Sequence, residues 1–182
     1  MSVHEVASAG TSIWLDDLSR AKITGTDSHS LPSRIANSGV VGVTTNPSIF
    51  SNAISGAAEY SADIAAMKSA TVDDVVKKLT TDDVRQACDL FAPIFSSSKG
   101  FDGRVSIEVD PRLARDTEGT IAAGKELWAI VYRPNVMIKV PATIEGLPAI
   151  TALIAAGISV NVTLIFSVKR YGQVIDLSLI HI

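Results

Sequence analysis

Five short apolar runs place the strongest constraint on what this chain can fold into. They cover residues 12–16, 40–45, 104–109, 136–140 and 159–164. Most are apolar at successive positions, which is typical of strands that are covered on both faces. Helical patterns fill the intervals, at residues 30–37, 59–69, 72–79, 81–95, 112–132 and 144–156. Strands that alternate with helices predict an α/β fold with a parallel sheet and helical crossovers.

The spacing of these runs fits a (β/α)₈ TIM barrel, which allots roughly 30 residues to each βα unit. The interval at residues 46–103 is about twice that long and holds no strand pattern, so we expect a helical insert at residues 51–100. We therefore expect a partial barrel of about five βα units over residues 12–176, preceded by a tail at residues 1–11.

Composition excludes several kinds of partner and cofactor. The net charge of −3 offers no basic excess to neutralise a phosphate backbone, so we expect no nucleic-acid partner. A single cysteine, Cys88, rules out an internal disulfide framework, and the three scattered histidines do not have the spacing of a metal site. No glycine-rich dinucleotide motif follows any of the strands.

Targeting signals are also missing. The N-terminal residues lack the basic start and apolar stretch of a secretory signal, so a cytoplasmic location is expected. Residues 146–168 carry no charge and are long enough to span a bilayer. However, Gly157 interrupts the stretch and residues 158–166 are rich in β-branched side chains, which favours a helix followed by a strand over a membrane helix.

Polar or ionisable side chains stand at or near the end of every expected strand. In parallel α/β folds the carboxyl ends of the strands form the active-site face. Their convergence on one face predicts a site more strongly than any one of them alone. The residues are Asp16 and Asp17, Thr45 and Asn46, Glu108, Lys139, and Asn161 with Thr163.

Lys139 and Glu108 are the most informative of these residues. Lys139 lies in an otherwise apolar strand, and burial of an amine favours the neutral, nucleophilic form. The alternative is a strand-end lysine whose ammonium group reaches water. Glu108 could act as an acid or base, or could simply form an ion pair with Lys139.

The polar residues at two other strand ends could also have purely structural roles instead of functional ones. Strand alternation sends one of Asp16 and Asp17 inward, and we expect the outward one to cap the next helix. Asn46 precedes Pro47, a pattern typical of a turn that leads into a helix.

Five longer motifs surround these strand ends in chain order. They are residues 13–20 (IWLDDLSR), 42–50 (GVTTNPSIF), 105–110 (VSIEVD), 136–143 (VMIKVPAT) and 158–166 (ISVNVTLIF). With these motifs the chain resembles the bacterial transaldolases over about residues 12–176. The combination of TTNPS with the later IKVPAT is the most specific part of the resemblance.

The resemblance implies a barrel of the Schiff-base aldolase type that uses neither a metal nor an organic cofactor. Such enzymes of the pentose phosphate pathway transfer a dihydroxyacetone unit from fructose 6-phosphate or sedoheptulose 7-phosphate to an aldose phosphate. By motif position, Lys139 would form the Schiff base and Asp16 would take the proton from the C4 hydroxyl. Glu108 and Thr163 would hold the water that relays protons.

The resemblance also implies substrate-binding roles for Asn46, Thr45 and Asn161, and sugar phosphates as partners. A homo-oligomer is left open for a full-length protein. The sixth-strand serine and the nearby arginine that grip the substrate phosphate have no counterpart here, and Arg170 belongs to the helix after the fifth strand. Residues 177–182 match the translation of a transposase adapter sequence, so we expect a non-native tail. Five of eight strands cannot close a barrel and leave two open edges, so we expect the fragment to be inactive and aggregation-prone.

Two other functions remain open at this point. A fructose-6-phosphate or deoxyribose-phosphate type of aldolase would use the same fold and the same lysine chemistry. The long insert favours transaldolase over these smaller enzymes. A non-catalytic α/β binding module with five strands would need no Schiff-base lysine at all.

Overall fold

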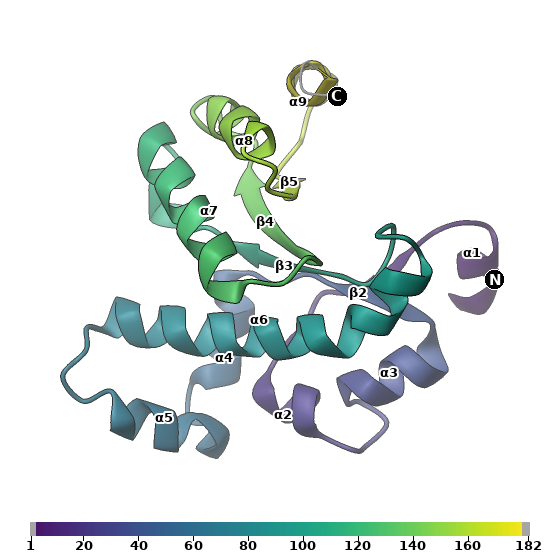
Figure 1. The fold of residues 1–182 in the computed structure, drawn as a ribbon, viewed down its shortest axis with the longest axis vertical. Helices are drawn as coiled ribbons and strands as arrows, with labels where there is room; N and C mark the ends of the chain where they lie inside the picture. Colours follow the sequence, from purple (N-terminus) through teal and green to yellow (C-terminus); the bar gives the residue numbers. More distant parts are fainter. Residues whose placement is uncertain (1–2, 180–182) are drawn as a thin grey trace. The chain divides into compact units, whose positions relative to one another are not determined.

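The computed structural model describes residues 3–179 and contains a five-stranded sheet (Figure 1). The strands are β1 (Ile13–Leu15), β2 (Val40–Val43), β3 (Arg104–Glu108), β4 (Val136–Pro141) and β5 (Val160–Thr163). Their order in the sheet is the order of the chain, and the pairs β1–β2, β2–β3 and β4–β5 are parallel. The expected α/β class with a parallel sheet is therefore confirmed.

Helices occupy the intervals between the strands. They are α1 (Val3–Ser8), α2 (Arg20–Thr24), α3 (Leu31–Ser38), α4 (Pro47–Ile54), η1 (Ala58–Tyr60), α5 (Ser61–Ala66), α6 (Val72–Ser97), η2 (Pro111–Leu113), α7 (Thr117–Val131), α8 (Gly146–Ala155) and α9 (Val168–Leu179). The interval between β2 and β3 holds α4, η1, α5 and α6 and no strand. Residues 3–8 of the expected N-terminal tail are helical, and α9 continues through residues 177–179 of the expected C-terminal tail. Residues 1–2 and 180–182 of those tails lie outside the described residues.

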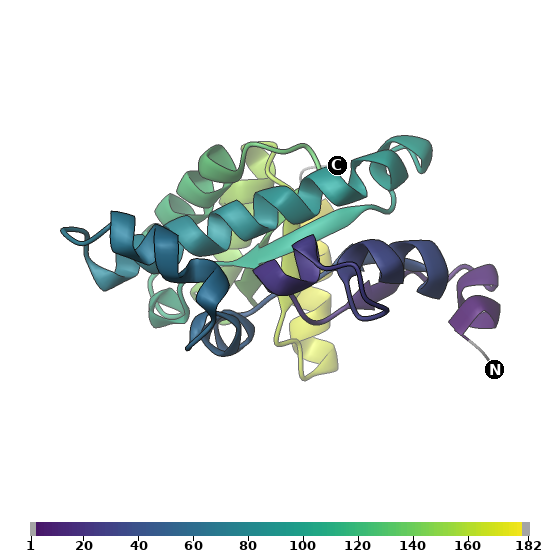
Figure 2. The ribbon, with the colours of Figure 1, turned by 90° about the horizontal axis from the view of Figure 1, so that it is seen from below.

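Two helix predictions are wrong in their boundaries. The expected helices at residues 72–79 and 81–95 are one continuous helix, α6, which Figure 2 shows running without interruption. The expected break falls at Thr80, but the hydroxyls of Thr80 and Thr81 donate to the carbonyl of Lys77 and stay within the helix. The expected helix at residues 112–132 is divided into η2 and α7, because Asp116 caps α7 by accepting from the amide of Gly119 at 2.9 Å.

The chain divides into two compact units. Of the described residues, unit 1 contains residues 3–105 and 133–135, and unit 2 contains residues 106–132 and 136–179. Strand β3 contributes residues to both. In unit 1 the side chains of Val43, Val84 and Phe91 are fully buried, and α6 contacts both β2 and α2.

Unit 2 has its own apolar core. Helices α7 and α8 lie side by side next to β4 (Figure 1). The side chains of Ile138, Ile150 and Leu153 are fully buried there. A Cβ atom at Gly124 would come within 2.9 Å of Leu153, so this glycine allows the two helices to approach closely. In the part of the chain that the structure describes, no helix is both long and apolar enough to cross a membrane.

Candidate functional site

The polar side chains of unit 2 gather on one face of its strands. Lys139 and Asn161 are register partners in β4 and β5, as are Pro141 and Thr163 two positions further on. Partners in a parallel pair point to the same side of the sheet, and so do residues two apart in one strand. Lys139, Asn161 and Thr163 therefore share a face.

Two contacts connect this face to β3. The Lys139 Nζ atom lies 3.5 Å from the Glu108 Oε2 atom, and both side chains are only 13% exposed. The side-chain amide of Asn161 donates to the Ser106 hydroxyl at 2.8 Å. The fully buried Ser106 was missed in the sequence analysis, although its position two residues before Glu108 already places it on the same face.

Burial controls the electrostatics of the Lys139–Glu108 pair. It raises the pKa of the Glu108 carboxyl, and the nearby Lys139 ammonium group and its hydrogen bond oppose that rise. The predicted ion-pair contact between the two residues is thus present. A carboxyl group with a raised pKa, in contact with an amine, is suited to exchange protons with it.

The remaining predicted residues lie in unit 1. Asp16 is exposed directly after β1, and Asn46 accepts at its Oδ1 atom from the amide of Ile49 at 2.9 Å. The alternative expected for Asn46, a turn that leads into a helix, is therefore realised, because this bond caps α4. Thr45 is fully buried. The substrate contacts of these three residues stay predictions.

The expected helix cap at the end of β1 is wrong. The N-cap of α2 is Ser19, whose hydroxyl accepts from the amide of Lys22 at 3.2 Å. Asp17 forms an ion pair with Lys22 instead. The serine lies directly before the first helical residue, so its oxygen reaches the free amide that the side chain of Asp17 would have served.

Other polar groups add little to the site. Arg170 lies in α9, the helix after the fifth strand. Cys88 is a buried free thiol whose pKa burial raises to about 12, so it is not a nucleophile near neutral pH. Among residues 3–179, no group of three or more His, Cys, Asp or Glu side chains is arranged to hold a metal ion.

The order of elements and the parallel sheet place the chain among the α/β proteins built from repeated βα units. Within that class, residues 13–179 match the family model described as "Transaldolase/Fructose-6-phosphate aldolase", and the chain belongs to this family.

Relatives named transaldolase are similar over nearly the whole chain. The protein of Saccharopolyspora erythraea is 54% identical over 177 residues, which cover 96% of this chain and 47% of that protein. The protein of Acidothermus cellulolyticus is 56% identical over 94% of this chain and 46% of its own length. The protein of Mycobacterium tuberculosis is 57% identical with the same coverage. The chain thus spans about half the length of these curated relatives.

Proposed function

We propose that this chain carries the Schiff-base half of a transaldolase. The enzyme transfers a dihydroxyacetone unit from fructose 6-phosphate or sedoheptulose 7-phosphate to an aldose phosphate. The observation that carries the proposal is the largely buried Lys139, 3.5 Å from Glu108 and in register with Asn161. The family membership and the relatives named transaldolase support it.

Lys139 is the nucleophile in this proposal. Its neutral amine adds to the C2 ketone of the donor, and the resulting carbinolamine loses water to form an iminium ion. Protons must move from nitrogen to the leaving hydroxyl during these steps. Glu108 lies within reach of the amine, and its raised pKa suits it to hold and return such a proton, with Thr163 helping to bind the relaying water.

Asp16 is the base for carbon–carbon bond cleavage. Its carboxylate takes the proton of the C4 hydroxyl, the C3–C4 bond breaks, and the electron pair moves to the iminium nitrogen to leave an enamine on Lys139. The first aldose phosphate departs. The enamine carbon then attacks the aldehyde of the acceptor, Asp16 returns its proton to the new hydroxyl, and water releases the product ketose from Lys139.

Three polar side chains bind the substrate hydroxyls in this scheme. Asn46 uses its carbonyl oxygen to cap α4, which leaves its amide group to donate to a hydroxyl. Asn161 is oriented by its bond to Ser106. Thr45, which is fully buried next to Asn46 in the chain, is the third of these proposed substrate-binding residues. The buried reduced cysteine is in keeping with the cytoplasmic location expected from the sequence.

Reduction of the imine by borohydride tests this proposal. The protein tested is an extended chain, in which residues 1–176 are followed by the C-terminal half of the Mycobacterium tuberculosis relative. With fructose 6-phosphate present, we expect borohydride to attach the sugar covalently at Lys139, as mapped by peptide mass spectrometry. Lys139→Met should abolish labelling, whereas Lys125→Met, at an exposed position in α7, should not change it.

The products separate transaldolase from the family's aldolase activity. A transaldolase should release free aldose phosphate in quantity only when an acceptor aldose phosphate is present, because the enamine otherwise stays on Lys139. An aldolase should release free dihydroxyacetone without an acceptor. Absence of any adduct at Lys139 in the extended chain would refute Schiff-base chemistry of either kind.

A further inference from the structure

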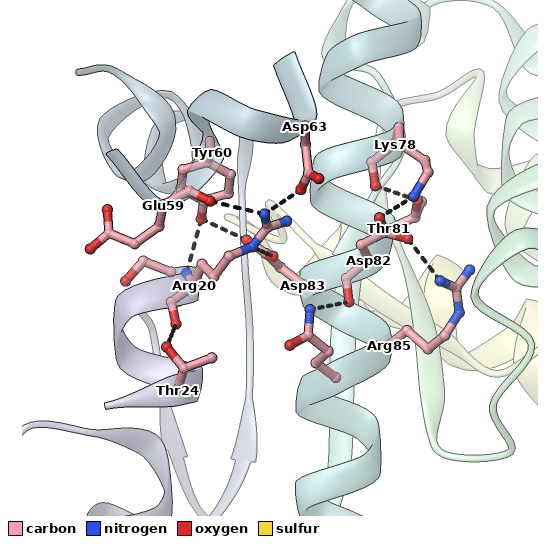
Figure 3. A network of polar contacts seen from close by, with 12 residues as sticks. Arg20, Thr24, Glu59, Tyr60, Asp63, Lys78, Thr81, Asp82, Asp83 and Arg85 are labelled. Atoms are coloured by element: carbon pink, nitrogen blue, oxygen red, sulfur yellow. Dashed lines mark hydrogen bonds and ion pairs between the residues drawn. The ribbon is translucent and has the colours of Figure 1, made fainter. Parts of the chain in front are cut away.

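A cluster of charged and aromatic side chains in unit 1 has no part in the scheme above. We call it the Arg20 cluster, and it consists of Arg20, Tyr60, Asp63 and Asp83 (Figure 3). The Arg20 Nε atom donates to Asp83 Oδ1 at 3.0 Å, and its Nη1 atom donates to Asp63. The Tyr60 hydroxyl accepts from the backbone amide of Arg20 at 2.9 Å and donates to Asp83 Oδ2 at 2.6 Å. The guanidinium group also stacks over the Tyr60 ring, 4.5 Å from its centre.

Three of the four members are held away from water. The Asp83 side chain is fully buried, Tyr60 is 1% exposed and the Arg20 side chain is 14% exposed, whereas the Asp63 side chain is 49% exposed. Burial raises the pKa of both the Asp83 carboxyl and the Tyr60 phenol, and each of them is hydrogen-bonded within the cluster. Buried polar groups that are hydrogen-bonded to one another, as Arg20, Tyr60 and Asp83 are, hold a single arrangement of the elements that they join.

The cluster joins the helical insert to the loop that follows β1. Tyr60 ends η1, Asp63 lies in α5 and Asp83 lies in the buried part of α6, so all three belong to the segment between β2 and β3. Arg20 is the first residue of α2 and the last residue of the motif that contains Asp16. The insert is therefore joined at Arg20 to the segment that carries Asp16, the proposed base of the reaction.

The loop between Asp16 and Arg20 is fixed at both ends. At its start, the amide of Thr44 donates to the carbonyl of Leu15 at 2.9 Å. At its end, the Arg20 amide is held by Tyr60, and the intervening Leu18 is fully buried. Within the described residues, the exposed carboxylate of Asp16 makes no hydrogen bond or ion pair of its own. Its position therefore depends on the backbone that carries it.

We propose that Arg20 and Tyr60 are positioning residues for Asp16, so that the helical insert serves to hold the base of carbon–carbon cleavage in place. This inference rests on the proposed function. It assigns the insert to one step of the reaction, because Lys139 and its partners lie in unit 2 and the Arg20 cluster lies in unit 1.

Two conservative substitutions in the extended chain test the inference. Tyr60→Phe keeps the ring but removes the hydroxyl that links the Arg20 backbone amide to Asp83. Arg20→Lys keeps the positive charge but removes the planar guanidinium group that bonds to Asp83 and Asp63. For both we expect kcat to fall about tenfold or more, which is typical of a misplaced catalytic group. The rate of borohydride trapping at Lys139 should stay within about twofold of wild type. The matched control is Arg133→Gln. It breaks the ion pair of Arg133 with Asp89, which lies in α6 like Asp83, and it should change neither rate.

Hydrogen exchange in the 182-residue chain gives a readout independent of activity. Tyr60→Phe should speed amide exchange at residues 16–20, while amides in β4 and β5 stay as protected as in wild type. A purely structural role would lower trapping and kcat together, because both would follow the folded fraction. That outcome, or an unchanged kcat, overturns the inference. Loss of both activities from the unmutated extended chain overturns the proposed function instead.

Discussion

Lys139, the proposed nucleophile, has surroundings that were predictable from the sequence, but not all of its neighbours were predictable. An apolar strand around Lys139 indicated burial, and the structure gives its side chain 13% exposure with Glu108 as ion-pair partner. Truncating either member of such a pair leaves a buried charge without compensation. The contribution of this pair to stability therefore depends on pH, and the raised pKa of Glu108 sets the direction of that dependence.

Replacing Glu108 with Gln should change how stability depends on pH. The pKa of Glu108 is raised above its ordinary value of 4.5, so the folded state binds this proton more tightly than the unfolded state. The stability that this group contributes is complete below pH 4.5 and is lost as pH rises through the higher, folded-state pKa. Each tenfold change in proton affinity corresponds to about 1.4 kcal/mol.

Urea unfolding of the wild type and of Glu108→Gln, at a series of pH values from about 4 to 7, measures this effect. The free energy of unfolding of the wild type should fall relative to that of the variant as pH rises. Losing the contact with Lys139 displaces the whole curve, but only the slope of the difference reports the titration of Glu108. Parallel curves across this range would contradict the raised pKa.

At the scale of elements, strands β1 and β2 are paired through a close contact between a tryptophan and a glycine. Trp14 and Gly42 are register partners, and a Cβ atom at Gly42 would lie only 2.5 to 2.8 Å from the Trp14 ring. The ring of Trp14, which lies two residues before Asp16 in the chain, therefore covers Gly42. Glycine at this position allows the aromatic ring to lie flat against the strand.

Gly42→Ala should consequently destabilise the chain by about 1 to 3 kcal/mol, because the ring and both strands must shift to admit a methyl group. Gly172→Ala is the matched control, since nothing lies within 4 Å of a Cβ atom at this position in α9. The control should stabilise the chain by about 0.5 to 1 kcal/mol, as alanine favours a helix interior over glycine. Midpoints of urea unfolding check both, and equal effects of the two substitutions would show that the ring does not restrict Gly42.

Elements were predictable from the sequence where a local signal decides them. Helix α3, which Ser30 and Gly39 cap, lies within one residue of the expected range 30–37 at each end, and all five strands lie where the apolar runs predicted them. The break predicted within α6 failed because Thr80 and Thr81 satisfy their hydroxyls inside the helix, where their pattern is the same as that of a helix start.

The site shows the same division between local and long-range information. Alternation along β5 was enough to place Asn161 and Thr163 on one side of the sheet, whereas the register of β4 with β5 was needed to place Lys139 there too. The bond from Asn161 to Ser106 and the contacts of Arg20 with Tyr60 and Asp83 join residues distant in sequence. Their existence depends on tertiary packing, which no local pattern encodes.

At the scale of the whole molecule, unit 2 exposes an unusual concentration of apolar side chains after β5. Phe166 is 87% exposed, Val168 is 89% exposed and Leu164 is 54% exposed, all within five consecutive residues. Exposed apolar side chains that lie close together in this way favour association with other protein surfaces. Since the chain spans about half the length of its relatives, we expect this segment to make the isolated chain self-associate.

Sedimentation velocity over a range of concentrations tests the expected self-association. The weight-average sedimentation coefficient of the wild-type chain should rise with concentration. The double variant Phe166→Ser and Val168→Glu should show little or no rise, because it removes two of the most exposed apolar side chains and places an acidic group in the first turn of α9, where it favours the helix. Phe101→Ser is the control, since Phe101 is 74% exposed but lies in unit 1, outside this segment. A wild-type chain that sediments as a monomer at every concentration would contradict the prediction, and equal association of all three proteins would place the contact elsewhere.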